Sequence, residues 1–311
     1  MRVFVAGASG AIGRPLVPKL IAAGHEVTGT TRSERKAEAI RAAGADAAVV
    51  DVLDPDALRI VVDAARPEVV IDELTELPDR LNFRGEDTYA STNRLRTEGT
   101  RNLIEAARAA GARRFVCQSI AFAYRTDGQG LRTEDDPLLD DAAGGFGSGV
   151  KAIREMEKMV LGSEGMDGLV LRYGFFYGPG TYYGPGGSST EDIRRRRLPV
   201  VGQGTGVFSF VHVDDAADAT VAAVERGAPG VYNVADDEPA PMSEWVPAAA
   251  EALGAKPPRR VPVWLAKLAA GKGAATFALE LRGVSNEKAK RELHWQPAHP
   301  SWRTGFAESL S

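Results

Sequence analysis

Residues 2–13 of this chain read RVFVAGASGAIG, and an amphipathic run over residues 14–23 follows them at once. The apolar residues 2–6 predict a short buried strand, and the glycines predict a tight turn into a helix. Glycine suits such a turn because it tolerates a positive φ and lets the backbone approach a phosphate or a neighbouring helix closely. The first N–H groups of the helix attract phosphate. The stretch predicts a dinucleotide-binding turn, with a purely structural turn as the alternative, and the expected contacts are Gly7, Ser9, Gly10, Ala11, Ile12 and Gly13.

The alternation of strand and helix continues over the first half of the chain. Further apolar runs predict strands at residues 26–30, 46–50, 69–72, 114–119 and 169–173. Amphipathic patterns between them predict helices at residues 34–43, 55–65, 93–110 and 150–163. Continuous apolar strands alternating with helices are typical of a parallel sheet covered on both faces. The sequence therefore predicts an α/β fold, a Rossmann-type doubly wound parallel sheet.

The pattern changes after residue 173. Residues 174–206 are rich in glycine and predict loops, whereas residues 207–235 resume a strand–helix–strand pattern. The remainder predicts three or four helices. We therefore expect a nucleotide-binding domain over residues 1–173, to which 207–235 return, and a smaller, mainly helical substrate lobe built from 174–206 and 236–311.

Composition excludes several classes of protein. A net charge of −4 argues against a general nucleic-acid binder. The single cysteine, Cys117, permits no internal disulfide, and the four histidines lack metal-ligand spacing. No apolar stretch reaches the roughly 18 residues of a membrane span. We expect a cytoplasmic protein without a metal that binds a small-molecule substrate, and a homodimer is one assembly that the sequence leaves open. The basic run Arg194–Arg197 reads as a solvated surface, with an anchor for a substrate carboxylate or phosphate as the alternative.

The end of the second strand predicts which nicotinamide cofactor binds. Thr31-Arg32 stand there, and Arg35 follows closely. An acidic side chain at this point favours the ribose 2′-hydroxyl of NAD, whereas a basic one favours the 2′-phosphate of NADP. Arg32 has no carboxylate beside it in the sequence, so NADP is preferred over NAD; alternatively, Arg32 only caps the strand. Asp51-Val52, after the third strand, are expected at the adenine edge.

At this point the chain resembles the extended short-chain dehydrogenase/reductase superfamily over nearly its whole length. The resemblance implies a Rossmann domain with a small substrate lobe. It also implies cofactor contacts from Leu74, Thr75, Lys151, Tyr173 and Phe176. The motifs that carry it are the glycine loop, Asp51-Val52, Asn93 with GTRNL at 99–103, RFV at 114–116, LRY at 171–173, YGPG at 177–180, FVHVDD at 210–215, YNV at 232–234 and SNEKAKREL at 285–293.

The catalytic residues of that superfamily are only partly present. They comprise a serine or threonine, a tyrosine that acts as the acid, and a lysine four residues later that lowers the pKa of the tyrosine. Lys151 fits the lysine, but Gly147 stands where the tyrosine belongs. Ser119 fits the end of the fifth strand, although the active serine often stands one position later, at Ile120. This departure resembles the atypical, epimerase/dehydratase-like members, which keep the nucleotide loop and lose the catalytic set.

Another group would then have to supply the proton. Tyr124 is the preferred substitute because it follows the fifth strand at the edge where open α/β sheets bind ligands. Ser119 is expected to orient a substrate oxygen. Lys151 is expected to contact the nicotinamide ribose, or alternatively to pair with Glu155 in solvent. Other tyrosines at the same edge or in the glycine-rich loop read as packing residues: Tyr173, Tyr177, Tyr182 and Tyr183.

The histidine and acids near residue 212 are expected to be structural. Asp214 occupies the position where a helix N-cap belongs, before an alanine-rich run. This reading is preferred over acid–base chemistry by His212 with Asp214 and Asp215.

Three functions follow from these patterns. The preferred one is an enzyme, an NAD(P)-dependent oxidoreductase that uses NADP to reduce a small carbonyl or imine substrate with an unusual proton donor. The second is an epimerase, dehydratase or cyclase that recycles its nucleotide or keeps it as a structural group. The third is a non-catalytic sensor of NADP(H), which Gly147 favours because glycine cannot transfer a proton.

Overall fold

The computed structural model describes residues 1–80, 86–139 and 144–310. Its centre is a seven-stranded parallel sheet in the order β11-β6-β5-β4-β1-β2-β3. The predicted fold class is confirmed. The strands are β1 (Arg2–Ala6), β2 (Glu26–Thr31), β3 (Asp46–Val49), β4 (Val69–Asp72), β5 (Arg114–Ile120), β6 (Asp167–Tyr173) and β11 (Gly230–Val234).

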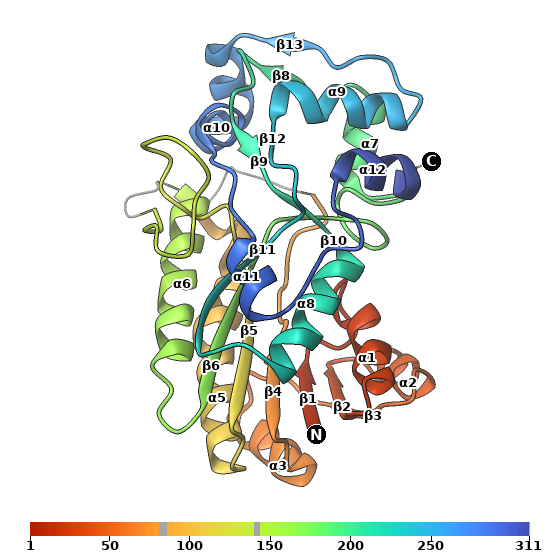
Figure 1. Ribbon diagram of the computed structural model, residues 1–311, viewed down its shortest axis with the longest axis vertical. Helices are drawn as coiled ribbons and strands as arrows, with labels where there is room; N and C mark the ends of the chain where they lie inside the picture. The colour runs from red at the N-terminus through yellow and green to blue at the C-terminus, as the bar shows by residue number, and fades with distance from the viewer. Residues whose placement is uncertain (81–85, 140–143, 311) are drawn as a thin grey trace.

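Helices cover both faces of the sheet (Figure 1). Side chains alternate along β1, so that Val3 and Val5 enter one core and Phe4 and Ala6 enter the other. The first core lies under α1 (Gly13–Ala22), α2 (Glu34–Ala42), α8 (Val213–Glu225) and α11 (Glu287–Glu292). The second lies under α3 (Pro55–Ala65), α5 (Thr100–Ala109) and α6 (Gly144–Leu161).

The strand at the edge beside β6 belongs to the second half of the chain. β11 pairs with β6 in parallel from Gly230 to Val234, and α8 packs against α1. The chain therefore leaves the sheet after β6 and comes back to it through α8 and β11. The predicted boundaries between the domain and the lobe stay a prediction.

A smaller lobe stands above the carboxyl ends of the strands (Figure 1). It has its own aromatic core, which includes Phe210, Trp245, Trp302 and Phe306. Its helices are α7 (Ser188–Arg194), α9 (Met242–Ala252), α10 (Val263–Glu280) and α12 (Trp302–Leu310). Short strand pairs link its loops: β7 (Phe175–Tyr177) with β10 (Phe210–His212), β9 (Val207–Phe208) with β12 (Ala240–Pro241), and β8 (Val200–Val201) with β13 (Arg260–Val261).

Two predicted segments differ from the structure. The helix expected at 93–110 consists of α4 (Ala90–Arg94), a π-helical turn η2 (Leu95–Gly99) and α5. The segment 174–206, expected as loops, contains β7, α7 and β8. These short elements are held by pairing with distant segments, so the local sequence carried little sign of them. Across the described ranges, no helix combines the length and the apolar character needed to cross a membrane.

Candidate active site

A cavity of about 1180 Å³ lies where the carboxyl ends of the parallel strands face the lobe. This is the edge at which open α/β sheets bind ligands. One half is lined by the turns that follow β1, β2, β3 and β4, and the other half is lined by residues of the lobe and α6, several of them aromatic. Of the residues predicted to bind the cofactor, those that line the cavity are Gly7, Ser9, Gly10, Ala11, Ile12, Thr31, Arg32, Asp51, Val52, Leu74, Thr75 and Phe176.

The glycine loop forms a cradle that side chains would fill. Gly7 has a φ of +89°, and a Cβ there would lie 2.8 Å from the carbonyl oxygen of Glu73. A Cβ on Gly13 would lie 2.3 Å from the carbonyl oxygen of Gly7. Gly13 itself does not line the cavity; it begins α1 and lets the helix start against the loop. The loop conformation therefore requires glycine, and because Gly7, Gly10 and Ile12 line the cavity, the site fits the pyrophosphate of a dinucleotide.

The adenosine end of the cavity carries more charge than the sequence pattern indicated. Arg32 has no carboxylate beside it in the sequence, but in the structure its Nη2 lies 3.1 Å from Oε2 of Glu76, which follows β4. Arg35 is exposed and does not line the cavity, whereas Ser33 and Lys36 do. Lys36 is one position beyond the arginine that sequence reasoning chose. The two residues are neighbours in α2, so their side chains point in different directions, and that of Lys36 is the one that lines the cavity.

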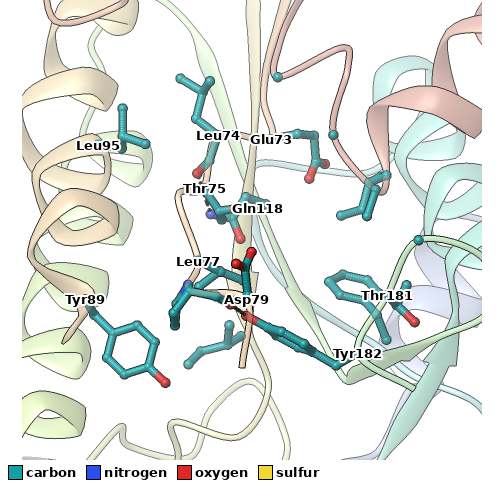
Figure 2. Close-up of a pocket in the computed structure, with 18 of the residues that line it drawn as sticks. Glu73, Leu74, Thr75, Leu77, Asp79, Tyr89, Leu95, Gln118, Thr181 and Tyr182 are labelled. Atoms are coloured by element: carbon teal, nitrogen blue, oxygen red, sulfur yellow. Dashed lines mark hydrogen bonds between the residues drawn. The ribbon is translucent and has the colours of Figure 1, made fainter. Parts of the chain in front are cut away.

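Glu73 lines the cavity directly beside the glycine loop, and sequence reasoning missed it. Figure 2 shows its carboxyl group pointing into the cavity. Its Oε1 lies 2.9 Å from the hydroxyl of Tyr173, and its buried Oε2 has no partner among the described residues. Burial raises the pKa of Glu73 to about 8. The signal in the sequence was a second acid directly after the buried strand β4.

The hydrogen bonds of Tyr173 fix where a proton on Glu73 can sit. The Tyr173 hydroxyl lies 2.7 Å from Oγ1 of Thr220, and Thr220 donates to the carbonyl oxygen of Ala216. Tyr173 donates to Oε1 of Glu73, so a proton on the carboxyl group belongs on Oε2, which has no partner among the described residues. Tyr173 was expected to contact the cofactor, but its side chain is fully buried in this chain of contacts and does not line the cavity.

The structure does not bring the predicted catalytic hydroxyls to the cavity. Ser119 is fully buried and donates to Oε1 of Glu157 at 2.7 Å. The Tyr124 hydroxyl donates to Oδ1 of Asn233 and accepts from Nη1 of Arg172, each at 2.7 Å. Burial raises the pKa of Tyr124 to about 12. The expectation that Tyr124 supplies a proton and Ser119 orients substrate is corrected, because both are committed to a buried network.

The helix that should carry the tyrosine and lysine offers little chemistry to the cavity. Among the described side chains of α6, those that line it are Phe146, Gly149 and Ile153. Lys151 is exposed and does not line the cavity, so its expected contact with the nicotinamide ribose stays a prediction. This face of the site is therefore apolar where the superfamily places its acid.

The substrate half of the cavity has an aromatic wall. Phe122 stacks on Phe175 with ring centroids 4.2 Å apart, and Phe277 meets Phe146 edge-on at 4.8 Å. Tyr182 also lines the cavity, and its hydroxyl donates to the carbonyl oxygen of Pro78. This wall suits a flat, apolar ligand.

One arginine of the run at 194–197 reaches the cavity. Arg195 lines it, but its Nη2 lies 3.2 Å from Oε2 of Glu191. Glu191 also pairs with Arg194, and Arg196 donates to the carbonyl oxygen of Pro257. These side chains are thus already partnered within the lobe.

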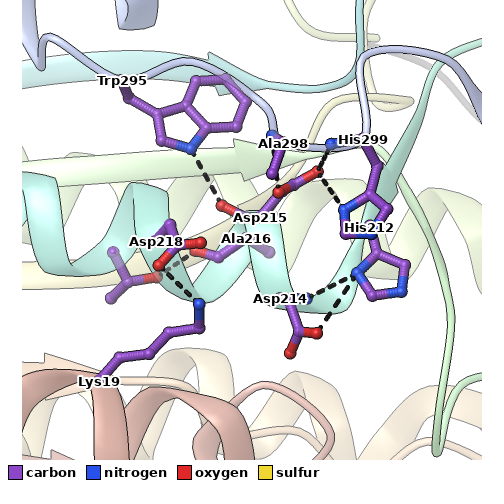
Figure 3. A network of polar contacts seen from close by, with 10 residues as sticks. Lys19, His212, Asp214, Asp215, Ala216, Asp218, Trp295, Ala298 and His299 are labelled. Carbon is purple, nitrogen blue, oxygen red and sulfur yellow. Dashed lines mark hydrogen bonds and ion pairs between the residues drawn. The ribbon is translucent and has the colours of Figure 1, made fainter.

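The acids near His212 are structural, although not in the predicted way (Figure 3). The N-cap of α8 is His212, whose Nδ1 accepts from the backbone N–H of Asp214 at 3.2 Å, so the prediction of Asp214 as the cap is wrong. Asp215 is buried and accepts from the backbone N–H groups of Ala298 and His299, both at 2.9 Å. It thereby ties the C-terminal segment to α8. Nowhere in the described ranges do His, Cys, Asp and Glu gather into a group able to hold a metal ion.

Comparisons with known proteins agree with this geometry. The family model described as "NAD dependent epimerase/dehydratase family" matches residues 3–235. A Streptomyces protein named 3-diazoavenalumate denitrifying reductase is 49% identical over 308 residues, covering 98% of this chain and 99% of that protein. The 2-alkyl-3-oxoalkanoate reductase of Stenotrophomonas maltophilia is 27% identical, covering 82% of this chain and 76% of its own. The solved UDP-glucose 4-epimerase of Thermotoga maritima is 24% identical with a TM-score of 0.78, covering 100% of this chain and 97% of that one.

Proposed function

This chain belongs to the NAD dependent epimerase/dehydratase family, and on that premise we propose that it is an NADPH-dependent reductase that removes nitrogen from an aromatic diazonium compound. A nicotinamide dinucleotide cofactor follows from the family. The substrate class is suggested by the name of the Streptomyces relative, which shares 49% of its residues with this chain over nearly the full length of both.

Different residues of the cavity would hold the different phosphate groups of the cofactor. The backbone of Gly7, Gly10 and Ile12 would hold the pyrophosphate. Arg32 and Lys36 would face a 2′-phosphate, which supports NADP over NAD. When bound, the reduced nicotinamide supplies a hydride, and addition of hydride to a diazonium cation gives a neutral diazene that releases N₂ and keeps the hydrogen.

The observation that carries the proposal is the absence of a tyrosine at position 147 beside an intact nucleotide cradle. Reduction of a ketone creates an alkoxide, and a positioned acid there contributes about 10²- to 10⁴-fold in rate. Addition of hydride to a diazonium cation cancels a charge instead of creating one. The reaction therefore needs no proton donor at the point where the described residues of α6 that line the cavity are glycine and apolar.

Ketone reduction is the second candidate, and one observation favours it. Glu73 is a carboxyl group that is neutral at physiological pH and lines the cavity, so it could donate the proton that an alkoxide needs. The name of the Stenotrophomonas relative is also that of a reductase of an oxo compound.

The two candidates differ in what they release. We would incubate the purified protein with NADPH and 4-carboxybenzenediazonium labelled with nitrogen-15, and follow NADPH absorbance together with labelled N₂ by mass spectrometry. We expect one N₂ for each NADPH oxidised, at a rate above that of a sample without protein. The Gly13→Ala variant is the matched control, because a Cβ there would collide with the glycine loop.

NADPH oxidation with simple 3-oxo acids but without N₂ release from diazonium compounds would favour the ketone candidate. Tight NADPH binding with no oxidation on either class of substrate would favour a sensor.

A further inference from the structure

Arg96 is a buried arginine in the wall of the cavity, and no carboxylate pairs with it among the residues that the structure describes. Arg96 lines the cavity and is only 7% exposed to solvent. Within the described ranges, its one side-chain hydrogen bond joins Nη1 to Oδ1 of Asn93 at 3.4 Å, and its buried Nε has no partner. Burial lowers the pKa of Arg96 to about 10, so the guanidinium is still charged at neutral pH. An uncompensated buried charge is costly, and proteins keep one where a ligand supplies the opposite charge.

The local backbone is built to present this side chain. Arg96 is the second residue of the π-helical turn η2, and single π turns within helices occur frequently at functional sites. The turn packs against α6. A Cβ on Gly149 of α6 would lie 3.9 Å from Nη1 of Arg96, so any larger side chain there would begin to cover the guanidinium. Glycine at 149, two residues after the vacant tyrosine position, thus keeps the cation open to the cavity.

Other cavity arginines do not share this state. Arg195 is paired with Glu191, Arg32 with Glu76 and Arg80 with Asp192. All three are exposed, so a contact with an anion is weakened there by water and salt. Arg96 is the buried cation among them, and a bound anion would meet it in a low-dielectric environment.

The chemistry of the surroundings defines the ligand. A planar guanidinium binds a carboxylate with two parallel hydrogen bonds. Phe122 and Phe146 line the same cavity and suit a flat, apolar body. We propose that Arg96 anchors the carboxylate of the substrate, which makes the substrate an aromatic or otherwise flat unsaturated carboxylic acid. This assignment rests on the proposed function only in taking the occupant to be the substrate.

A phosphate of the cofactor is the other source of an anion. It is disfavoured because the glycine loop, Arg32 and Lys36, which line the cavity at the ends of β1 and β2, would hold the phosphates there. Arg96 lies on η2, between Asn93 and Gly149.

A pair of neutral and charged probes tests the anchor without turnover. We would measure the Kd of NADP⁺ first, and then titrate the NADP⁺-saturated protein with cinnamate and with cinnamamide by calorimetry. The wild-type protein should bind cinnamate more tightly than cinnamamide by about 10- to 100-fold, the value of one charge-assisted, bidentate contact. In Arg96→Gln the two probes should bind with nearly equal affinity, and Arg96→Lys should retain part of the preference.

The control is Arg101→Gln, which removes an arginine from the neighbouring helix α5. Arg101 pairs with Glu155 on the surface and does not line the cavity, so this variant should keep the wild-type preference. A ratio of two affinities is insensitive to partial misfolding. Folding of Arg96→Gln is checked by its melting temperature, which should not fall, since the substitution removes an uncompensated charge.

Three results would overturn the proposal: no preference for cinnamate in the wild type, a preference that survives in Arg96→Gln, or a loss of NADP⁺ affinity in Arg96→Gln with the preference intact. These results are independent of N₂ release. A protein that binds cinnamate through Arg96 but releases no N₂ contradicts the proposed function alone.

Discussion

Arg172 and Glu157 form a buried ion pair between β6 and α6, with Nε 2.9 Å from Oε1 and Nη2 2.5 Å from Oε2. The pair also engages Ser119 through Glu157 and Tyr124 through Arg172. Breaking a buried pair costs about 3–5 kcal/mol, so its neighbours are held in place strongly. Two hydroxyls that stand near the superfamily's catalytic positions in the sequence therefore support the interior instead of the cavity.

Tyr124→Phe should lower stability and leave turnover per folded molecule close to that of the wild type. Removal of the hydroxyl leaves Oδ1 of Asn233 and Nη1 of Arg172 without their 2.7 Å contacts. Unsatisfied buried groups of this kind cost about 1–3 kcal/mol. Urea unfolding and NADPH oxidation, measured on the same preparation, check this. A collapse of turnover in a variant with wild-type stability would return Tyr124 to a catalytic role.

Gly13→Ala should weaken NADP(H) binding more than Gly10→Ala does. A Cβ on Gly13 would lie 2.3 Å from the carbonyl oxygen of Gly7, whereas a Cβ on Gly10 would lie 3.2 Å from the same oxygen. The first requires the loop to move and the second requires a small shift. We expect at least a roughly tenfold rise in Kd for Gly13→Ala, equivalent to ~1.4 kcal/mol. Fluorescence titration with NADPH measures both variants, and equal effects would contradict the cradle described above.

Glu76→Gln should tighten the binding of NADPH and leave the binding of NADH nearly unchanged. Glu76 pairs with Arg32, and both side chains are about half exposed. Loss of the carboxylate frees Arg32 for a 2′-phosphate and removes a repulsive charge. Exposed pairs are worth about 0–1 kcal/mol, so the expected gain is at most about fivefold.

The converse substitution is Lys36→Ala, which should weaken NADPH binding and spare NADH. Titrations with both nucleotides at low and high salt separate these effects, since contacts with a 2′-phosphate at an exposed site weaken in salt. Equal changes for NADPH and NADH would contradict the preference for NADP.

Glu73→Gln should change how stability depends on pH. Burial raises the pKa of Glu73 from 4.5 to about 8, so between these values the folded protein holds a proton that the unfolded chain has released. Stability contributed by this neutral carboxyl group is therefore lost as pH rises through that window. Glutamine carries no such proton, so the variant should gain melting temperature relative to the wild type between pH 5 and pH 8.

Two other buried acids also make the stability of the protein depend on pH. Burial raises the pKa of Asp72 to about 6 and that of Asp236 to about 8, which gives the same sign of dependence. Both are present in the wild type and in Glu73→Gln, so they cancel in the difference between the two. A difference in melting temperature that stays constant from pH 5 to pH 8 would mean that Glu73 is ionised in the folded protein.

Local sequence patterns predicted the main sheet well because each buried strand is a continuous run of apolar residues. All six strands expected before residue 174 are present, β4 with the same bounds, and α3 begins after Asp54, whose side chain accepts from the backbone N–H of Ala57. The glycine loop could also be predicted from the sequence, because Gly7 and Gly13 stand where a Cβ would collide with the backbone. Short elements such as α7 were missed because contacts with distant segments hold them.

Roles of polar side chains were harder to predict, because direction and partner are set by residues far apart in the chain. Arg32 gained a carboxylate partner 44 positions away, and the Tyr173 hydroxyl met Glu73 100 positions before it. Neither neighbour can be identified by reading along the sequence. Arg96 gave no sign of being functional, since an arginine in an amphipathic helical pattern usually faces solvent.

By itself the sequence determined that a parallel α/β sheet carries a dinucleotide cradle and that Gly147 leaves the tyrosine's place empty. Those facts are local, because glycine and apolar periodicity constrain the backbone wherever they stand. Only the tertiary structure decided that Ser119 and Tyr124 face the interior while Glu73 and Arg96 face the cavity. Which of these side chains faces the cavity depends on which buried charges are paired, and the packing of β6, α6 and η2 decides the pairing.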